Sequence, residues 1–314
     1  MSKPTAEIRV GISGWRYADW RGKFYPKGLP QRSELEFASS LFNSVEINGS
    51  FYSLQRPSSY QRWYQATPPG FLFGVKGGRF ITHMRKLKKV ETPLANFFAS
   101  GVLALREKLG PILWQLPPSF SWNKERLEEF FGLLPPNTRT AAGLAKKRDN
   151  KLKARAVLKI DISRPSRYAL EVRHESFMTP DFFELLRKHN IAFVFADAAG
   201  KWPYAEDLTA DFIYIRLHGD TKLYASSYNS KALDRWSDRI KKWRCGKQPR
   251  DAKLIGKRRG DNQSRDVFVF FDNDAKVHAP FDAIRLGRQL GVAWRRPKKS
   301  KVAIVDLVRK HRRE

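Results

Sequence analysis

Short apolar segments recur along the whole chain and alternate with segments of helical spacing, and this alternation limits the possible folds more than any other feature. Eight segments have the length and composition of β-strands: 8–13, 44–48, 71–76, 112–116, 168–173, 191–196, 212–218 and 267–271. Helical spacing is found between almost all of them, at 34–42, 57–63, 92–109, 123–133, 180–188, 234–243 and 281–290. Strands that alternate with helices form parallel sheets. We therefore predict an α/β protein with a single (β/α)₈ TIM-type barrel.

The length of the chain and its lack of a nucleotide-binding motif favour this fold. A TIM barrel takes about 250 residues plus insertions, and the chain has 314 residues. The alternative is an open doubly wound sheet, but no Gly-x-Gly-x-x-Gly sequence follows any strand segment. We assign 1–294 to the barrel and 295–314 to a basic C-terminal tail, in which 302–311 has helical spacing. The sequence leaves the cofactor unknown.

The compartment is inferred from cysteine content and from the distribution of apolar residues. Cys245 is the only cysteine, so no intrachain disulfide can form. No apolar run approaches the roughly 20 residues that cross a bilayer, and the polar start 1–7 does not resemble a signal peptide. We therefore expect a cytoplasmic protein with no membrane partner. Its oligomeric state is left open.

The net charge of +29 is concentrated in three stretches. Residues 139–167, 235–265 and 295–313 hold 31 of the 60 Lys and Arg residues but only 6 of the 31 Asp and Glu residues. Such basic insertions are typical of a surface that contacts nucleic acid or another polyanion, and also of a solvated surface. The three stretches follow or include the helices after the fourth, seventh and eighth strand segments, so we expect most of this charge at the end of the barrel opposite the active site. The composition of 244–265 predicts a mobile loop.

The segment 44–52 indicates where the barrel presents polar groups. Successive side chains of a strand point to opposite faces, so Val45 and Ile47 share one face while Glu46 and Asn48 share the other. The apolar face of a barrel strand contacts helices, and the polar face then looks into the barrel. Active sites of TIM barrels lie at the carboxyl ends of the strands. We therefore expect Glu46 and Asn48 at such a site.

Six other strand segments also end in ionisable or amide side chains. These residues are Lys76, Gln115, Glu171, Arg173, Asp197, Arg216, His218, Asp272 and Asn273. Their charges could pair as an internal salt-bridge network, but burying ion pairs is costly and often adds no stability. We therefore interpret the convergence of these groups as a functional site.

The residue types at this site predict an enzyme, either a hydrolase or a lyase, that acts on a small polar or anionic substrate. We assign acid–base catalysis to Glu46, Glu171 and His218. The residues assigned to substrate binding are Asn48, Tyr52, Lys76, Gln115, Arg173, Asp197, Arg216, Asp272 and Asn273. Several of these are hard metal ligands, but no local His or Cys motif accompanies them, so we predict no metal. The alternative function is nucleic-acid binding or processing through the basic insertions and tail.

A series of ordered motifs is spread over residues 8–294. They are Gly11-Ile12-Ser13-Gly14-Trp15, Phe24-Tyr25-Pro26, Val45-Glu46-Ile47-Asn48, Ser50-Phe51-Tyr52, Ile81-Thr82-His83, Gln115-Leu116-Pro117-Pro118, Glu171-Val172-Arg173-His174, Arg216-Leu217-His218-Gly219 and Phe271-Asp272-Asn273-Asp274. Together they resemble the YecE-like family, catalogued as domain of unknown function seventy-two. The resemblance implies a TIM-type barrel and no agreed reaction. Many relatives look like Phe-Asn-Asn-Asp at the last motif, so Asp272 replaces an amide, and the tail lies outside the resemblance.

Overall fold

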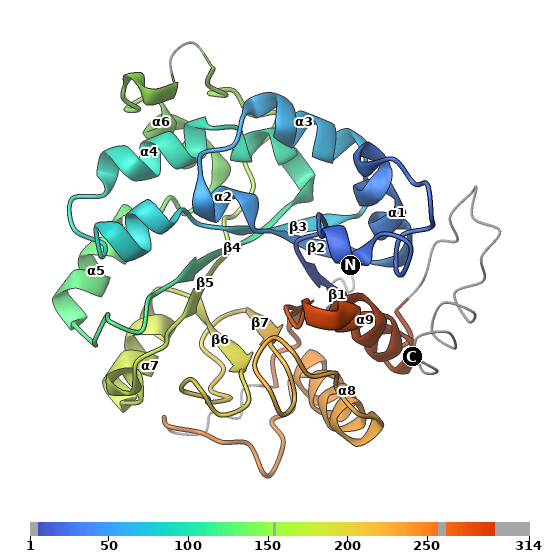
Figure 1. Cartoon of the computed structure of the whole chain (residues 1–314). Coiled ribbons are helices and arrows are strands. Elements are labelled where there is room, and N and C mark those ends of the chain that lie inside the picture. The colour runs from blue at the N-terminus through green and yellow to red at the C-terminus, as the bar shows by residue number, and fades with distance from the viewer. Residues whose placement is uncertain (1–5, 153–154, 257–261, 293–314) are drawn as a thin grey trace, which may run out of the picture.

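The computed structural model describes residues 6–152, 155–256 and 262–292. Its eight strands form a closed barrel in chain order, and all neighbours pair in parallel, including β1 with β8. The strands are β1 (Ile8–Ser13), β2 (Ser44–Ile47), β3 (Leu72–Lys76), β4 (Leu109–Gln115), β5 (Tyr168–Glu171), β6 (Ile191–Asp197), β7 (Phe212–Leu217) and β8 (Asp266–Phe271). The prediction of a single (β/α)₈ TIM-type barrel is confirmed (Figure 1).

Helices surround the strands (Figure 1). They are α1 (Glu34–Leu41), α3 (Pro57–Gln65), α4 (Glu91–Ala99), α5 (Lys124–Leu133), α6 (Thr138–Ala145), α7 (Pro180–Lys188), α8 (Ser230–Arg244) and α9 (His278–Gln289). A short turn, α2 (Gly49–Tyr52), follows β2 at the carboxyl end of the barrel. The irregular turns are η1 (Ala18–Trp20), η2 (Gln31–Ser33), η3 (Phe80–Met84), η4 (Val102–Lys108), η5 (Asn150–Leu152), η6 (Glu175–Phe177) and η7 (Ala275–Val277). The connection between β6 and β7, which is described throughout, contains no α-helix.

The strands contribute to two apolar layers, and alternation along each strand decides which layer a side chain joins. Ile12, Val45 and Trp114 belong to the outer layer, between the strands and the helices. Ala169 and Val194 belong to the inner layer, which fills the barrel. Towards the carboxyl ends, the inward positions become polar. The barrel therefore has an apolar base and a polar carboxyl end, which is where a site can form.

The helix expected over 92–109 is wrong in its second half. Helix α4 ends at Ala99, and the chain turns at Gly101, whose φ is +123°. A Cβ on this glycine would lie 2.7 Å from Cα of Pro57 and 2.7 Å from Cδ2 of Tyr60. Only glycine adopts this conformation easily and leaves room for α3. The chain then continues as η4, a 3₁₀ segment that is interrupted at Arg106, rather than as an α-helix.

The basic stretch 139–167 contains most of a helix, α6, that we did not expect. Its first turn is capped by Asn137, whose side chain accepts a hydrogen bond from the backbone N–H of Thr140 at 2.9 Å. The buried face includes Ala141 and Ala145, and α6 contacts α4. Alanine contributes little to a hydrophobic pattern, so the surrounding Lys and Arg residues obscured the helical spacing.

The second basic stretch packs against the connection between β6 and β7, where an α-helix is missing. The carboxylate of Asp207 in this connection accepts hydrogen bonds from the backbone N–H groups of Ile255 and Gly256, both at 2.8 Å. The N–H of Glu206 donates to the carbonyl of Lys253 at 2.7 Å. The prediction of a mobile loop is therefore wrong for these residues, because their backbone groups are bound to the barrel.

The described parts of the second basic stretch also contact the amino end of the barrel. Nε of Arg244 donates to the carbonyl oxygen of Ala6, just before β1, at 2.7 Å. Nε of Arg265 donates to the carbonyl oxygen of Ala210, just before β7, at 2.9 Å. These arginines lie at the end opposite the polar carboxyl end, as expected from the order of the chain.

Two expectations concern segments that the structure does not describe. The tail 295–314, with the helical spacing at 302–311, lies outside the described residues, as do 257–261. Among the residues that are described, none of the helices combines the length and apolarity that a membrane span requires.

Candidate anion-binding site at the carboxyl end of the barrel

Arg216, in β7, is the centre of a charged network inside the barrel. Its Nη1 donates to Oε2 of Glu171 at 2.7 Å, and its Nη2 donates to Oε1 of Glu46 and Oδ2 of Asp272, both at 2.9 Å. Nη2 also donates to Oγ of Ser13 at 3.0 Å. The planar guanidinium presents five N–H donors in a rigid fork, so it can bind several acceptors that surround it in one plane. We call these residues the Arg216 network.

Glu46 is bound on both of its carboxylate oxygens. Besides Arg216, Oε1 accepts a hydrogen bond from the hydroxyl of Ser13, and Oε2 accepts one from the hydroxyl of Tyr214 at 2.5 Å. Burial and the neighbouring Glu46 carboxylate raise the pKa of Tyr214 far above its ordinary value. Glu46 is fully buried. Its carboxylate therefore belongs to the network rather than to an open surface.

Glu171 joins two arginines. Its Oε1 accepts a hydrogen bond from Nε of Arg173 at 2.8 Å, and its Oε2 is bound to Arg216. Burial alone raises the pKa of this carboxyl, but the charges of Arg173 and Arg216 outweigh burial and hold it well below its usual range. The pKa of Asp272 is lowered in the same way, chiefly by Arg216 against the effect of burial. Both groups stay ionised at neutral pH and accept protons poorly.

A pocket of about 520 Å³ lies at the carboxyl ends of β3, β4 and β5. Its lining consists of Phe51, Tyr52, Lys76, Arg79, His83, Met84, Gln115, Arg173 and Tyr224. Three of these residues carry positive charge, and none is acidic. The volume is sufficient for a small molecule. The pocket is therefore suited to a small anion.

Lys76 and His83 line this pocket with lowered pKa values. Burial, and next the charge of Arg216, lower the pKa of Lys76 to about 8. Burial, with the charges of Lys76 and Arg173, lowers the pKa of His83 to about 4. Nδ1 of His83 lies 2.9 Å from Oγ1 of Thr82. The pocket thus contains a neutral imidazole and a lysine that is partly unprotonated near neutral pH.

Aromatic rings separate His218 from the pocket. The guanidinium of Arg173 stacks on Trp202, with Cζ 3.6 Å from the ring centroid. The rings of Trp202 and Tyr224 pack edge-on to the imidazole of His218, at 5.2 and 5.4 Å between centroids. Nδ1 of His218 lies 3.0 Å from Oδ2 of Asp272, but neither ring nitrogen has a well-aligned hydrogen bond in the described chain. His218 is fully buried and lies behind the pocket wall.

The structure brings most of the predicted site residues together. Those that line the pocket are Tyr52, Lys76, Gln115 and Arg173. Those that lie in or against the Arg216 network are Glu46, Glu171, Arg216, His218 and Asp272. Strand alternation therefore placed all of these side chains except Tyr52, which lies in α2, on the inward face correctly.

Two predicted residues lie elsewhere, and a third contacts the network from its edge. Asp197 continues the helix-facing side of β6, and its Oδ2 accepts a hydrogen bond from Nε1 of Trp236 in α8 at 3.2 Å. Nδ2 of Asn273 donates to Oδ2 of Asp282 in α9 at 2.9 Å. Nδ2 of Asn48 donates to Oγ of Ser13 in the Arg216 network at 2.9 Å, and Asn48 also lines a separate cavity of about 240 Å³ beside α2. Asp197 and Asn273 are strand-end residues that point outward, so their expected place at the substrate is corrected to contacts with helices.

Sequence reasoning did not assign several residues to the site. Ser13 and Tyr214 occupy inward positions of β1 and β7, so the alternation rule was able to find them. Arg79 and His83 lie in or beside the irregular turn η3, and Trp202 lies in the connection after β6. Turns and connections of this kind have no periodic pattern, so side-chain alternation gives no signal for Arg79, His83 or Trp202.

The carboxylates of the network are not arranged as a metal centre. Within the described ranges, no group of three or more His, Cys, Asp or Glu side chains could hold a metal ion. Glu46, Glu171 and Asp272 surround the guanidinium of Arg216 instead.

Comparison with known families adds an independent line of information. Residues 9–303 match the family described as "Protein of unknown function DUF72". The chain belongs to the DUF72 family. The DUF72 match ends inside the segment 295–314, which we had expected to lie wholly outside the resemblance. The family description states no reaction.

Curated relatives of this DUF72 chain match it over part of their length. The UPF0759 protein YunF of Bacillus subtilis (strain 168) is 31% identical over 125 residues, which are 38% of this chain and 43% of YunF. The UPF0759 protein YecE of Escherichia coli (strain K12) is 28% identical over 113 residues, 36% of this chain and 39% of YecE. The chain therefore aligns with less than half the length of either relative.

Solved structures of DUF72 proteins have the same fold. A DUF72 family protein from Thermotoga maritima MSB8 superposes with a TM-score of 0.68 and 24% identity, covering 91% of this chain and 99% of that one. A DUF72 family protein from Enterococcus faecalis V583 gives a TM-score of 0.65 and 18% identity, covering 94% and 100%. At this level of identity the likeness concerns the barrel fold alone.

Proposed function

We propose that this DUF72 protein is an enzyme that acts on a small anionic substrate in the pocket at the carboxyl ends of β3, β4 and β5. The observation that carries the proposal is the pocket lining, in which Lys76, Arg79 and Arg173 are basic and no residue is acidic. A phosphate or carboxylate group is attracted to such a lining, and arginine can bind it through two parallel hydrogen bonds. The reaction class is hydrolysis or a lyase-type proton transfer.

In this proposal the buried carboxylates position cations rather than transfer protons. Glu171 holds Arg173 at the pocket, while Trp202 supports the other face of the guanidinium. Gln115 and Tyr52 orient the uncharged part of the substrate. Proton transfer, which we first assigned to Glu46, Glu171 and His218, belongs instead to Lys76 and His83, because these two groups line the pocket and burial lowers the pKa of Lys76 to about 8.

We propose a cytoplasmic location for this activity and a second, weaker role for the basic stretches. A single cysteine and no intrachain disulfide suit a reducing compartment. The second basic stretch has exposed cations such as Arg244, which lies beside Ala6 at the amino end of the barrel, so loose contact with nucleic acid would be on the side away from the pocket. Such contact is separate from the reaction in the pocket.

The anion site is tested by measuring the binding of inorganic phosphate to the wild type and to two matched variants. Arg79→Gln removes an exposed charge that lines the pocket, whereas Arg85→Gln removes an exposed charge near the other end of the same turn, outside the lining. We expect Arg79→Gln to weaken phosphate binding about fivefold, the effect of one solvent-exposed charged hydrogen bond, and Arg85→Gln to leave it within about twofold. Equal effects of the two variants, or no phosphate binding by the wild type in calorimetry, would contradict the proposal.

A further inference from the structure

Two buried lysines in this protein differ in the hydrogen-bonding partners of their amino groups. Nζ of Lys108 donates hydrogen bonds to the carbonyl oxygens of Tyr64 and Thr67, both at 2.6 Å, and to Oγ1 of Thr67 at 3.1 Å. Lys76 is buried to a similar degree, 8% exposed against 5% for Lys108. Its Nζ has no hydrogen bond and no carboxylate within 4.0 Å in the described chain. Burying an ammonium group without partners is costly, so the two lysines have different roles.

The surroundings of Lys76 leave its amine facing the pocket. Nζ lies 4.2 Å from the centroid of the Phe51 ring. The carboxylates of Glu46, Glu171 and Asp272 are bound to Arg216. Lys76 is therefore a pocket-lining amine whose nearest acids are already paired.

We propose that Lys76 is a nucleophile that forms an imine with a carbonyl group of the substrate, so that the substrate class is a small carbonyl compound with an anionic group. This inference rests on the proposed function, since Arg79 and Arg173 would bind the anionic group while Lys76 attacks the carbonyl carbon. The pKa of about 8 is consistent with an amine that is partly unprotonated at neutral pH.

The chemistry balances with groups that the pocket and solvent supply. The Nζ lone pair forms a C–N bond, the C=O π electrons move to oxygen, and the imidazole of His83 transfers one proton from the nitrogen to this oxygen, which gives a neutral carbinolamine. A second proton, taken from solvent through His83, protonates the hydroxyl, so water departs, the nitrogen lone pair forms the C=N bond, and the nitrogen keeps its last hydrogen. The protonated imine then accepts the electron pair of a neighbouring C–H or C–C bond. Water hydrolyses the imine at the end of the cycle, with no oxidant or reductant consumed.

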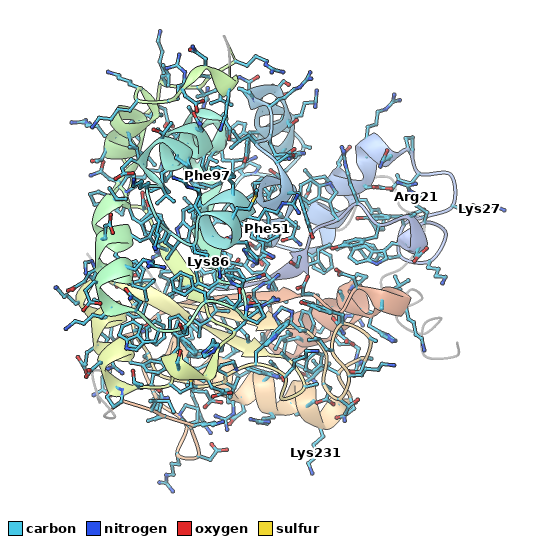
Figure 2. The ribbon with its side chains drawn as sticks, turned by 60° about the vertical axis from the view of Figure 1, so that its left-hand side comes forward. Arg21, Lys27, Phe51, Lys86, Phe97 and Lys231 are labelled. Carbon is cyan, nitrogen blue, oxygen red and sulfur yellow. The ribbon has the colours of Figure 1, made fainter. Side chains whose placement is uncertain are left out.

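The test uses two aldehydes and sodium cyanoborohydride, which reduces an imine to a stable amine. Glyoxylate is anionic and converts lysine to carboxymethyl-lysine, whereas formaldehyde is neutral and gives methyl-lysine. Peptide mass spectrometry measures the rate at each lysine of the wild-type protein. Lys231 is the internal control, because it projects from α8 into solvent (Figure 2).

We expect Lys76 to react at least about tenfold faster than Lys231 at pH 7.5 with both aldehydes, because burial lowers the pKa of Lys76 from 10.5 to about 8 and leaves its amine unprotonated far more often. Inorganic phosphate should slow the glyoxylate reaction. Arg79→Gln should slow the glyoxylate reaction about threefold and leave the formaldehyde reaction unchanged. Lys76→Arg should remove the fast site.

The two proposals fail in different ways. If Lys76 reacts no faster than Lys231 with formaldehyde, the imine proposal is overturned even where phosphate binds the pocket. If Lys76 reacts rapidly with both aldehydes but phosphate and Arg79→Gln have no effect, the nucleophile is supported and the anion site is overturned. The decisive measurement is made on the wild-type protein, so it does not depend on whether a variant folds.

Discussion

At the scale of single residues, the carboxyl end of the barrel contains two buried cations in opposite situations. Arg216 is bound by Glu46, Glu171 and Asp272, and this pairing offsets part of the loss of hydration of the four charges. Lys76 has no such partner in the described chain, and burial lowers its pKa. The difference indicates that Arg216 organises the site, while Lys76 is available for chemistry.

Lys76→Met should reduce the pH dependence of stability in alkaline solution. The pKa of Lys76 is about 8 in the folded protein against an ordinary 10.5, so unfolding takes up a proton between these values. Stability of the wild type relative to the variant should therefore rise with pH, by about 1.4 kcal/mol per pH unit across this window. Urea denaturation at several pH values measures the difference, with Lys231→Met as the exposed control. If the free energies of unfolding of the wild type and Lys76→Met change with pH in parallel, this prediction is contradicted.

Arg216→Met should destabilise the fold by about 3–5 kcal/mol, because three buried carboxylates lose their common partner. Neutralising these carboxylates in the same chain, with Glu46→Gln, Glu171→Gln and Asp272→Asn, should restore part of the loss. Chemical denaturation gives the free energies of unfolding.

The matched control for Arg216→Met is Lys242→Met, which breaks an exposed pair with Asp238 on α8. We expect it to change stability by less than about 1 kcal/mol. A similarly small effect of Arg216→Met, or a combined variant no more stable than the single one, would show that the network does not hold the barrel end together.

At the scale of elements, the barrel is complete without a helix between β6 and β7. The segment after α8 takes that place, and its backbone N–H groups at Ile255 and Gly256 are bound by the carboxylate of Asp207. The same carboxylate accepts a hydrogen bond from Arg187 at 3.1 Å. A buried carboxylate that accepts several hydrogen bonds can therefore attach a segment with few apolar residues.

Asp207→Ala should destabilise the protein by about 2–3 kcal/mol, since two backbone donors and Arg187 lose their acceptor. The amides of Ile255 and Gly256 should also exchange hydrogen faster. Asp211→Ala, at an exposed aspartate in the same connection, is the control and should change stability by less than about 0.5 kcal/mol. If amide exchange at Gly256 is unchanged in Asp207→Ala, the carboxylate does not attach this segment.

At the scale of the whole molecule, the barrel separates two positively charged regions. The pocket with Arg79 and Arg173 lies at the carboxyl ends of the strands, whereas Arg244 and Arg265 bind carbonyl groups at the amino ends. The two regions are thus on opposite ends of one barrel. Small anions and extended polyanions are expected to bind independently.

Duplex DNA should bind weakly, with an affinity that falls steeply with salt, and should not compete with phosphate for the pocket. Each phosphate contact contributes about −0.9 to the slope of log affinity against log salt. Fluorescence anisotropy at two salt concentrations measures how DNA affinity depends on salt. Comparing the full chain with a chain that lacks 295–314 gives the contribution of the tail to this affinity. Competition between DNA and phosphate would instead place the polyanion at the pocket.

The alternation of strand and helix segments was sufficient to predict the barrel, and the alternation of side chains along strands was sufficient to predict most of its inward polar residues. A strand has a strict period of two, so the inward direction of Glu46, Glu171 and Arg216 could be predicted from their apolar neighbours without knowledge of the fold. The closure of eight parallel strands then requires their carboxyl ends to meet. For this reason the sequence was informative about which groups converge.

Contacts between distant segments decided the rest. Asp197 and Asn273 follow the alternation to the helix-facing side of their strands, and contacts with neighbouring helices decide what they bind. Gly101 interrupts an apparently helical pattern because α3 leaves no room for a side chain. The pocket receives Arg79 and His83 from an irregular turn. Packing and hydrogen bonding between elements far apart in the chain determine such positions, and local sequence does not encode them.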